Sequence, residues 1–323
     1  MPEQVWQTNA LGGYFASPKL SKQIRHAAQP LMKFRQFVKP EPGYAKKSGD
    51  KILVNIVQDT DDDTGDTPIQ ETQKVPETQA QTIRVEVSVN EYGRKIPYTG
   101  KLEDLSEISP SDTFSVAIRN HMARSLDRAC AAAFITTPIV MTPTGTVSSK
   151  TQNFSTSGSP TDTATRHIAW DDFIEIKAYM KQVLKSPTFD GENYIGVANS
   201  YTMAAIEKDP TWRESKLYGD PASLFTGEIG KTSGIRWIEE NSFFSGSAAN
   251  KNFLGSGTYR GCGVVFGADA VAEAVAVAEE LRADPPTDMG RSKSIGWYFL
   301  GGWKLVWANS IQGHARIVRI ASL

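Results

Sequence analysis

Residues 109–134 read SPSDTFSVAIRNHMARSLDRACAAAF and carry the strongest helix signal in the sequence. Ser109 is a suitable N-cap, Pro110 fits the first helical position, and Asp112 stands where a capping-box acid would. Apolar side chains recur at i+3 and i+4 spacing and form a single stripe: Phe114, Ile118, Met122, Leu126, Ala129 and Ala133. We therefore predict one helix that ends at about Ile135, before Pro138, and spans roughly 37 Å at about 1.5 Å per residue.

Two strand-like runs precede this helix. They are KILVNIV at 51–57 and IRVEVSVNEY at 83–92, and the second alternates apolar with polar residues, as a half-exposed strand does. The 24 residues between them, 58–81, are polar, and a connection of that length usually has an external role. The sequence predicts a long hairpin over 46–100 with a flexible acidic tip.

The rest of the chain mixes single helices with strands. Residues 136–167 are dominated by Thr, Ser, Gly and Pro, and we expect a surface insertion or an extended loop there. Helices are predicted over 169–186 and 200–208, and strands over 194–199 and 235–240. The final third is β-rich, with GVVFG, a Val/Ala/Glu alternation at 271–277, WYFLGGWKLVWA and ARIVRI. Because there is no regular βα alternation, the pattern indicates an α+β fold.

The first 80 residues divide by charge. Residues 1–50 hold eight Lys/Arg against three Asp/Glu, a net of +5, and residues 51–80 hold two against seven, a net of −5. The first segment contains no long periodic element, but Trp6, Tyr14, Phe15, Phe34 and Phe37 make it too aromatic for a disordered tail. We expect an aromatic arm that packs on something else, and we expect the two segments to attract each other, within one chain or between copies.

The acidic run DTDDDTGDTPIQE, which begins at Asp59, resembles a calcium-binding loop. An EF-hand loop requires glycine at its sixth position and glutamate at its twelfth, and here Gly65 and Glu71 each come one place late. Strands rather than helices are predicted on both sides. The run therefore predicts weak attraction of cations and no dedicated calcium site.

Other partial motifs fail in a similar way. GEIGKTSG (227–234) has Phe225 where a phosphate-binding loop needs its first glycine, and a strand follows it instead of a helix. GSGTYRG (255–261) has Arg260 in place of the third glycine of a dinucleotide fingerprint. The four histidines lie in unrelated contexts, and no nucleophile elbow occurs. A soluble calcium- or nucleotide-binding enzyme is the rival hypothesis that these motifs would support, but we predict no enzyme, no cofactor and no metal.

Composition excludes further classes. A net charge of −1 gives no global reason to expect binding to nucleic acid or an anionic membrane. Cys130 and Cys262 lie far apart in small apolar contexts, which predicts reduced thiols. No apolar run reaches the length of about 18 residues needed to cross a bilayer, and no signal-peptide pattern is present. We expect a protein made in the cytoplasm.

The order of these elements resembles the major capsid proteins of tailed bacteriophages, which have the Hong Kong 97-type fold. VNEYGRKIPYTGKLEDLSEISPSDTF (89–114), running into IRNHMARSLDRACAAAF (118–134), is similar to the exit of their extended E-loop and their spine helix. GEIGKTSGIRWIEENSFF (227–244) is similar to a segment of their A-domain. The closing P-domain strands are matched by VVFGADAVAEAVAV (264–277), DMGRSKSIGWYFLGGWKLVW (288–307) and ARIVRIAS (315–322).

This resemblance implies an α+β capsid fold with five segments. They are an N-terminal arm (1–45), an E-loop (46–100), a P-domain with spine helix and surface insertion (101–168), an A-domain (169–262) and the C-terminal β strands of the P-domain (263–323). The implied function is a structural subunit that self-assembles into the pentamers and hexamers of an icosahedral head around double-stranded DNA. An encapsulin-like cellular compartment is the alternative on the same fold.

The resemblance also implies partners and a location. The partners are other copies of the chain, scaffold, portal and decoration proteins, and packaged DNA without sequence-specific recognition, but no membrane. The location is the virion capsid, assembled in the host cytoplasm. From the charge pattern we predict these subunit-interface residues: Arg25, Lys33, Arg35, Asp59, Asp61, Asp62, Asp63, Asp66 and Glu71.

Overall fold

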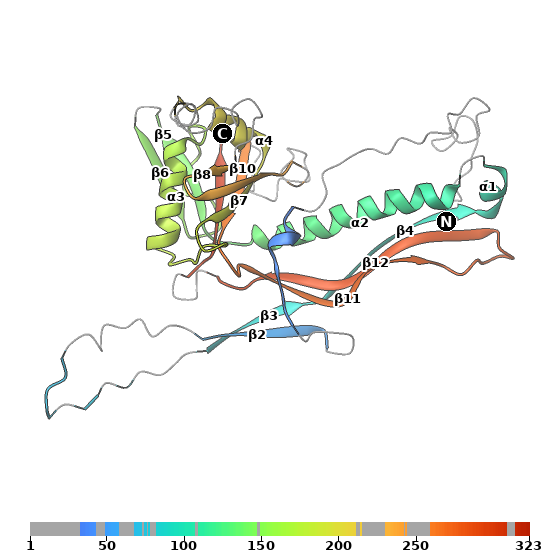
Figure 1. Cartoon of the computed structure of the whole chain (residues 1–323), viewed down its shortest axis with the longest axis horizontal. Coiled ribbons are helices and arrows are strands. Elements are labelled where there is room, and N and C mark those ends of the chain that lie inside the picture. The colour runs from blue at the N-terminus through green and yellow to red at the C-terminus, as the bar shows by residue number, and fades with distance from the viewer. Residues whose placement is uncertain are drawn as a thin grey trace.

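The computed structural model describes most of the chain and arranges it around one long helix, α2 (Pro110–Phe134) (Figure 1). The described residues are 33–42, 49–57, 68–72, 74–75, 77, 82–106, 109–146, 149–210, 214, 230–241, 243, 259–308 and 314–323. The bounds of α2 confirm the helix predicted from the apolar stripe. Ser109 is the N-cap residue and Pro110 begins the helix, as predicted, but the hydroxyl of Ser109 makes no capping hydrogen bond and lies 3.0 Å from that of Ser111.

A four-stranded sheet, here called the long sheet, lies along α2 and is joined to it through the short helix α1 (Gly100–Leu105). Its strands, in spatial order, are β1 (Lys39–Pro40), β11 (Val271–Ala283), β12 (Ser292–Leu305) and β4 (Asn90–Thr99). Ile118 and Leu126 of α2 are buried in one cluster with Trp297 and Phe299 of β12. Because side chains alternate along a strand, the neighbouring positions face the opposite side of the sheet.

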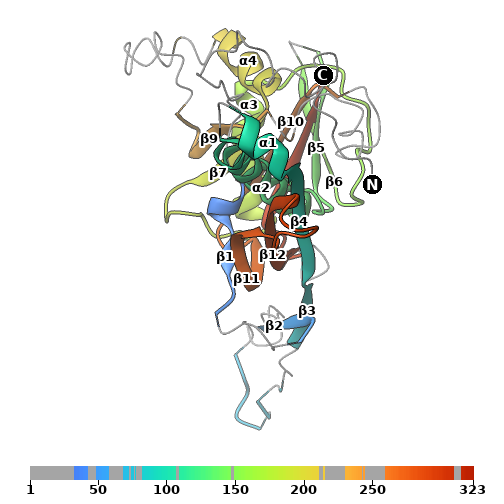
Figure 2. The same cartoon turned by 90° about the vertical axis from the view of Figure 1, so that its right-hand side faces the viewer.

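A separate hairpin leaves the long sheet on the side opposite α2, as both views show (Figures 1 and 2). Strands β2 (Lys51–Val57) and β3 (Thr82–Ser88) pair antiparallel, and their apolar residues pack at the root against Ala272 and Ala274 of β11. The hairpin is therefore present but shorter than the predicted 46–100. The alternating run 83–92 divides after Ser88, since β4 pairs with β12 and not with β2.

Gly302 lets the hairpin cross β12. A Cβ atom at this position would overlap the carbonyl oxygen of Ser88, the last residue of β3. We predict that Gly302→Ala lowers the free energy of unfolding by about 1–3 kcal/mol, because neither backbone can yield without distorting its own sheet. Urea denaturation of the unassembled subunit measures this change. Equal stability of Gly302→Ala and the wild type would contradict the crossing.

The compact end of the molecule is a seven-stranded sheet with two helices. In spatial order its strands are β6 (Lys150–Ser155), β5 (Val140–Gly145), β13 (Ile317–Ser322), β10 (Gly261–Phe266), β7 (Tyr194–Ala198), β9 (Ile235–Glu239) and β8 (Lys231–Thr232). Helices α3 (Trp170–Gln182) and α4 (Ser200–Lys208) contribute to the core on one face, and the C-terminal end of α2 contributes to the core on the other. The helices and strands predicted over 169–208 and at 235–240 are confirmed, as is the α+β class.

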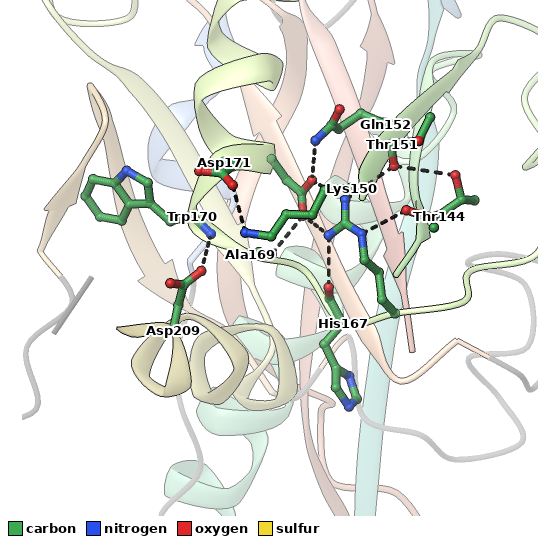
Figure 3. A network of polar contacts seen from close by, with 12 residues as sticks. Thr144, Lys150, Thr151, Gln152, His167, Ala169, Trp170, Asp171 and Asp209 are labelled. Carbon is green, nitrogen blue, oxygen red and sulfur yellow. Dashed lines mark hydrogen bonds and ion pairs between the residues drawn. The ribbon is translucent and has the colours of Figure 1, made fainter. Parts of the chain in front are cut away.

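Residues 136–167 are not a surface insertion, and that prediction is wrong. Strand β5 pairs with β13, and Ile139, Val140 and Met141 are fully buried. The segment is held against α3 by a buried ion pair: both terminal nitrogens of Arg166 donate to Asp172, each at 2.6 Å. Figure 3 shows the surrounding polar contacts to Thr144, Thr151, Gln152, His167 and Ala169.

The sheets also group the chain differently from the predicted segments. The seven-stranded sheet takes β5 and β6 from the segment 101–168 and takes β7, β8 and β9 from 169–262. Strand β10 begins at the end of that segment and lies mostly in 263–323, which also supplies β13. Strands β11 and β12 of the last segment belong to the long sheet instead. Each of these two sheets is therefore formed by strands that are distant in the sequence.

Candidate subunit interface

The described part of the arm is fixed to α2 by one carboxylate. Asp127 is buried on the helix, and its Oδ1 accepts hydrogen bonds from the backbone N–H groups of Lys33, Phe34 and Arg35 at 3.1, 2.9 and 3.1 Å. Three successive N–H groups that converge on one anion form a concave binding site for negative charge. The arm is therefore held to the helix through its backbone and not only through side chains.

Aromatic residues of the arm fill the junction between α2 and the seven-stranded sheet. Phe34 is fully buried, with its ring centroid 5.5 Å from that of Phe134. Phe37 follows within the short 3-10 turn Arg35–Phe37 and lies 5.5 Å from the ring of Phe266. For these two residues the structure confirms that the aromatic arm packs on another part of the protein. Trp6, Tyr14 and Phe15 lie outside the described residues.

Arg35 links the arm to β11 by charge. Its guanidinium forms ion pairs with Glu273 at 2.8 Å and Glu279 at 3.0 Å, and it lies 5.2 Å from the ring centroid of Phe299. Burial raises the pKa of Glu279, but the hydrogen bond and charge of Arg35 outweigh burial, so the pKa is lower than its ordinary value. Glu279 is therefore ionised at neutral pH and attracts the arm.

The predicted interface residues fall into two groups. Arg25, Asp59, Asp61, Asp62, Asp63 and Asp66 lie outside the described residues. Lys33 and Arg35 lie at the junction of the arm with α2, and Glu71 is exposed in a turn of the connection between β2 and β3. The structure does not bring Glu71 to Lys33 or Arg35 within one chain, and Arg35 is paired with carboxylates of its own chain. The role of all nine residues at a subunit interface stays a prediction.

Sequence reasoning did not find Asp127. On the sequence it is one acid in a helix, and its partners lie more than 90 positions away, so no local pattern marks it. The only signal was its position beside Leu126 in the apolar stripe, where a charged residue needs a buried partner.

The hairpin presents apolar side chains to solvent. Leu53 and Val57 of β2 are 49% and 65% exposed, and Ile69 and Val75, in the connection that follows, are 48% and 71% exposed. Ile52, Val54 and Ile56 lie on the other face of the ribbon. At the root of the hairpin this face packs against β11. A two-stranded ribbon with apolar residues on both faces is marginally stable by itself, so these side chains suit contact with another molecule.

The described residues show no arrangement suited to catalysis. Among them no group of three His, Cys, Asp or Glu side chains lies close enough to hold a metal ion. Both cysteines are free and buried, and burial raises the pKa of Cys262 to about 12, so its thiol stays protonated. The described part of GEIGKTSG, residues 230–234, contains the short strand β8 and the turn that leads into β9. Within the same residues, no helix is long and apolar enough to cross a membrane.

Several solved capsid structures are similar to this chain. The capsid structure of the cyanophage Pam1 matches with a TM-score of 0.71 and 13% identity, covering 95% of this chain and 96% of that one. The capsid of a native GTA particle matches with a TM-score of 0.63 and 18% identity over 98% of both chains. Mycobacterium phage Che8 matches with a TM-score of 0.63 and 16% identity over 94% and 96%. No curated protein matches the sequence.

These structural likenesses, at such low identities, show the fold. The family is shown by the sequence itself, since the model described as the phage capsid family matches residues 12–221, more than half of the chain. The resemblance noted from the order of its elements is thereby confirmed. The chain belongs to the phage capsid family and is a structural capsid protein with the Hong Kong 97-type fold of tailed-phage major capsid proteins.

Proposed function

We propose that this chain is the repeating subunit of an icosahedral phage head, which assembles from pentamers and hexamers and encloses double-stranded DNA. Its main partners are other copies of itself, with scaffold, portal and decoration proteins as further partners. Assembly takes place in the host cytoplasm. The DNA is contacted without sequence recognition.

The observation that best supports this proposal is the hairpin. Strands β2 and β3 extend from the long sheet, and Leu53, Val57 and Val75 leave apolar surface exposed. A single subunit cannot cover this surface, whereas a neighbouring copy can. Because the hairpin and its receiving surface are different parts of the molecule, the contact is head-to-tail, and such contacts close into rings when the rotation between subunits allows it.

We assign the elements to the parts of the capsid fold on the same basis. The arm is residues 1–45, and the hairpin β2–β3 with residues 58–81 is the E-loop. Helix α2 and the long sheet form the P-domain, and the seven-stranded sheet with α3 and α4 forms the A-domain. This assignment moves β5, β6 and β13 from the segments predicted by sequence to the A-domain, because their hydrogen bonds lie in its sheet.

We predict that replacing 58–81 by Asn-Gly leaves the subunit folded and prevents shell closure. Val57 and Thr82 are a cross-strand pair, so a two-residue turn can join them without disturbing the ribbon. Circular dichroism and urea denaturation test folding, and negative-stain electron microscopy tests assembly. A second variant changes the five aspartates of 59–66 to asparagine and keeps the length of the segment. It separates the effect of the negative charge from the effect of the segment's length.

Electron microscopy of the wild type decides the proposal itself. Shells that contain DNA are expected, and particles that contain only protein cargo would favour the encapsulin alternative. Absence of rings, sheets or shells under every assembly condition would contradict both. A deletion variant that fails to fold, or one that assembles like the wild type, would refute the role of 58–81.

A further inference from the structure

The long sheet ends at β4, and the outer edge of this strand has no neighbouring strand among the described residues (Figure 2). Glu91, Gly93, Arg94 and Lys95, in the middle of the strand, are all exposed. An open edge presents a row of N–H and C=O groups that can pair with a strand of another molecule. The edge of β4 is therefore a surface suited to contact between chains.

Alternate residues of β4 direct their backbone groups outward. A Cβ atom at Gly296 of β12 would lie 2.9 Å from the carbonyl oxygen of Arg94, so the backbone of Arg94 faces β12. In an antiparallel strand the N–H and C=O of one residue point to the same side, and successive residues alternate. The backbone groups of 91, 93 and 95 therefore face outward. None of the described residues forms a backbone hydrogen bond with these three.

The opposite edge of the long sheet is less suited to pairing. There β1 covers the start of β11, and register shifts interrupt β11 between Val275 and Val277 and again before Glu280. Partial cover and bulges are common ways in which proteins protect a sheet edge. By contrast, β4 pairs with β12 in one continuous register over residues 90–99. On its outer edge only Pro97, which has no N–H, limits further pairing.

The sequence of this edge is complementary to itself. Residues 91–95 read EYGRK. When two copies of β4 pair antiparallel with Gly93 opposite Gly93, Glu91 of each copy lies opposite Lys95 of the other. Tyr92 then lies opposite Arg94, and a guanidinium group is attracted to an aromatic face. Opposite charges directly across from each other stabilise a strand pair, and like charges destabilise it.

Other registers lack this match. A pair centred on residue 91 sets Glu91 against Glu91, and pairs centred on 94 or 95 set Arg94 or Lys95 against itself. A pair centred on 92 sets Glu91 against Gly93. A centre between two residues would set outward-facing groups against inward-facing ones, which cannot bond. The centre at Gly93 is therefore the one that places unlike charges opposite each other.

The side chains involved are accessible to a second copy. Lys95 pairs with Asp284 at 2.9 Å, but the Lys95 side chain is 63% exposed, so a second carboxylate can approach it. The two-fold axis of the strand pair is perpendicular to the sheet, and α2 thus lies on the same face in both copies. A closed single-layered shell requires this arrangement, because all its subunits turn the same face inward.

We propose that β4 of one subunit pairs edge to edge with β4 of a second copy about a two-fold axis at Gly93, which joins two long sheets into one. This inference rests on the proposed self-assembly of the chain. The hairpin contact is head-to-tail and closes rings. A two-fold contact uses the same surface on both subunits, so it joins a subunit of one ring to a subunit of the next.

Disulfide formation between two variants tests the register. Glu91→Cys is mixed with Lys95→Cys under mild oxidation, both as concentrated unassembled subunits and during shell assembly. Opposite residues in the strand pair have Cα atoms about 5.5 Å apart, within disulfide range. Two copies of residue 91 are separated by about 13 Å along the strands. A linked dimer is expected from the mixture and from neither variant alone. Cys130 and Cys262 are buried and do not compete.

The control for chance collision is a mixture of Glu280→Cys with Arg282→Cys. These residues have the same spacing class on β11 of the same sheet, and their side chains are 47% and 51% exposed. Since β11 is at the other edge, no linked dimer is expected. An equal yield from this mixture would overturn the inference, because exposure alone would then explain the linkage.

Charge reversal supplies a second measurement. Lys95→Glu sets acid against acid at both ends of the strand pair, and we expect about tenfold fewer shells at low salt. Glu91→Lys with Lys95→Glu restores opposite charges in reversed order and should restore the wild-type yield. Sedimentation of assembled particles measures both variants. Normal assembly of Lys95→Glu, or no recovery in the double variant, would overturn the inference.

The cross-linking also separates this contact from shell formation. Absence of a linked dimer from the Glu91→Cys and Lys95→Cys mixture, in solution and in shells, would overturn the pairing, as would linkage within either variant alone. If the wild type forms no shells, the proposed function fails. Cross-linking of the unassembled subunits then decides the β4 contact by itself.

Discussion

Asp172→Ala is expected to lower the free energy of unfolding of the subunit by about 3–5 kcal/mol, the cost of leaving a buried charge without its partner. Asp172 is fully buried at the start of α3, and it receives both terminal nitrogens of Arg166 at 2.6 Å. The same carboxylate accepts the backbone N–H of Ala169 at 2.7 Å and the amide of Gln152 at 2.9 Å. Its removal leaves the guanidinium of Arg166, which is only 8% exposed, without a counter-charge.

Urea denaturation of the unassembled subunit measures this change, and the neighbouring residue supplies the control. Asp171 pairs with Lys150 at 2.7 Å, but its side chain is 52% exposed, so Asp171→Ala should cost no more than about 1 kcal/mol. Figure 3 shows Asp171 beside Lys150 at the start of α3. Equal losses for the two variants would mean that burial does not govern the Arg166–Asp172 pair.

A double variant sharpens the result. Arg166→Met with Asp172→Leu removes both charges and keeps most of the volume, and it should be more stable than Asp172→Ala alone. If the double variant instead loses the sum of the two single changes, the residues act independently and the ion pair is not what fixes β5 and β6 to α3.

Asp127→Ala is expected to release the arm from α2. The change removes the one acceptor shared by three backbone N–H groups, and hydrogen bonds to a charged group contribute about 1.5–3 kcal/mol each. The N–H groups can turn to water once the arm is free, so we expect a net loss of about 2–4 kcal/mol, confined to the arm and the residues around Phe34.

Limited trypsin digestion reports this release directly. Cleavage after Lys33 or Arg35 should become much faster in Asp127→Ala, while cleavage elsewhere keeps its wild-type rate. Asp127→Asn keeps an acceptor oxygen without the charge and should fall between the two. Wild-type protection of the arm in Asp127→Ala would show that the aromatic contacts of Phe34 and Phe37 suffice to hold it.

Local patterns predicted the elements whose signal lies within a few residues. Helix α2 is specified by its apolar stripe and by Pro110, and α3, α4, β7 and β9 follow the same logic. The strands of the hairpin follow from period-two alternation. The end of the hairpin could not be predicted in this way. The alternation continues through Val89, although the chain stops pairing with β2 at Ser88 and pairs with β12 from Asn90 onward.

The segment 136–167 shows a different limit of sequence reasoning. Strand β5 is buried on both faces, so its side chains do not alternate, and its Thr and Pro residues resemble those of a loop. The groups that hold this region, Arg166 with Asp172, and those that hold the arm, Asp127 with the backbone at Lys33, meet only after folding. Interface residues chosen by charge alone could not reveal such contacts, and the role of all nine stays a prediction.

The position of β13 has a consequence for synthesis of the protein. Residues 317–322 form a strand between β5 and β10, so they lie in the middle of the seven-stranded sheet and not at its edge. While the ribosome is still translating earlier codons, β5 and β10 are present without the strand that joins them, and the buried surfaces of both remain open. The sheet can close only after residue 322 has left the ribosome, so a shorter nascent chain offers no finished surface to its neighbours, and assembly is restricted to chains that include β13.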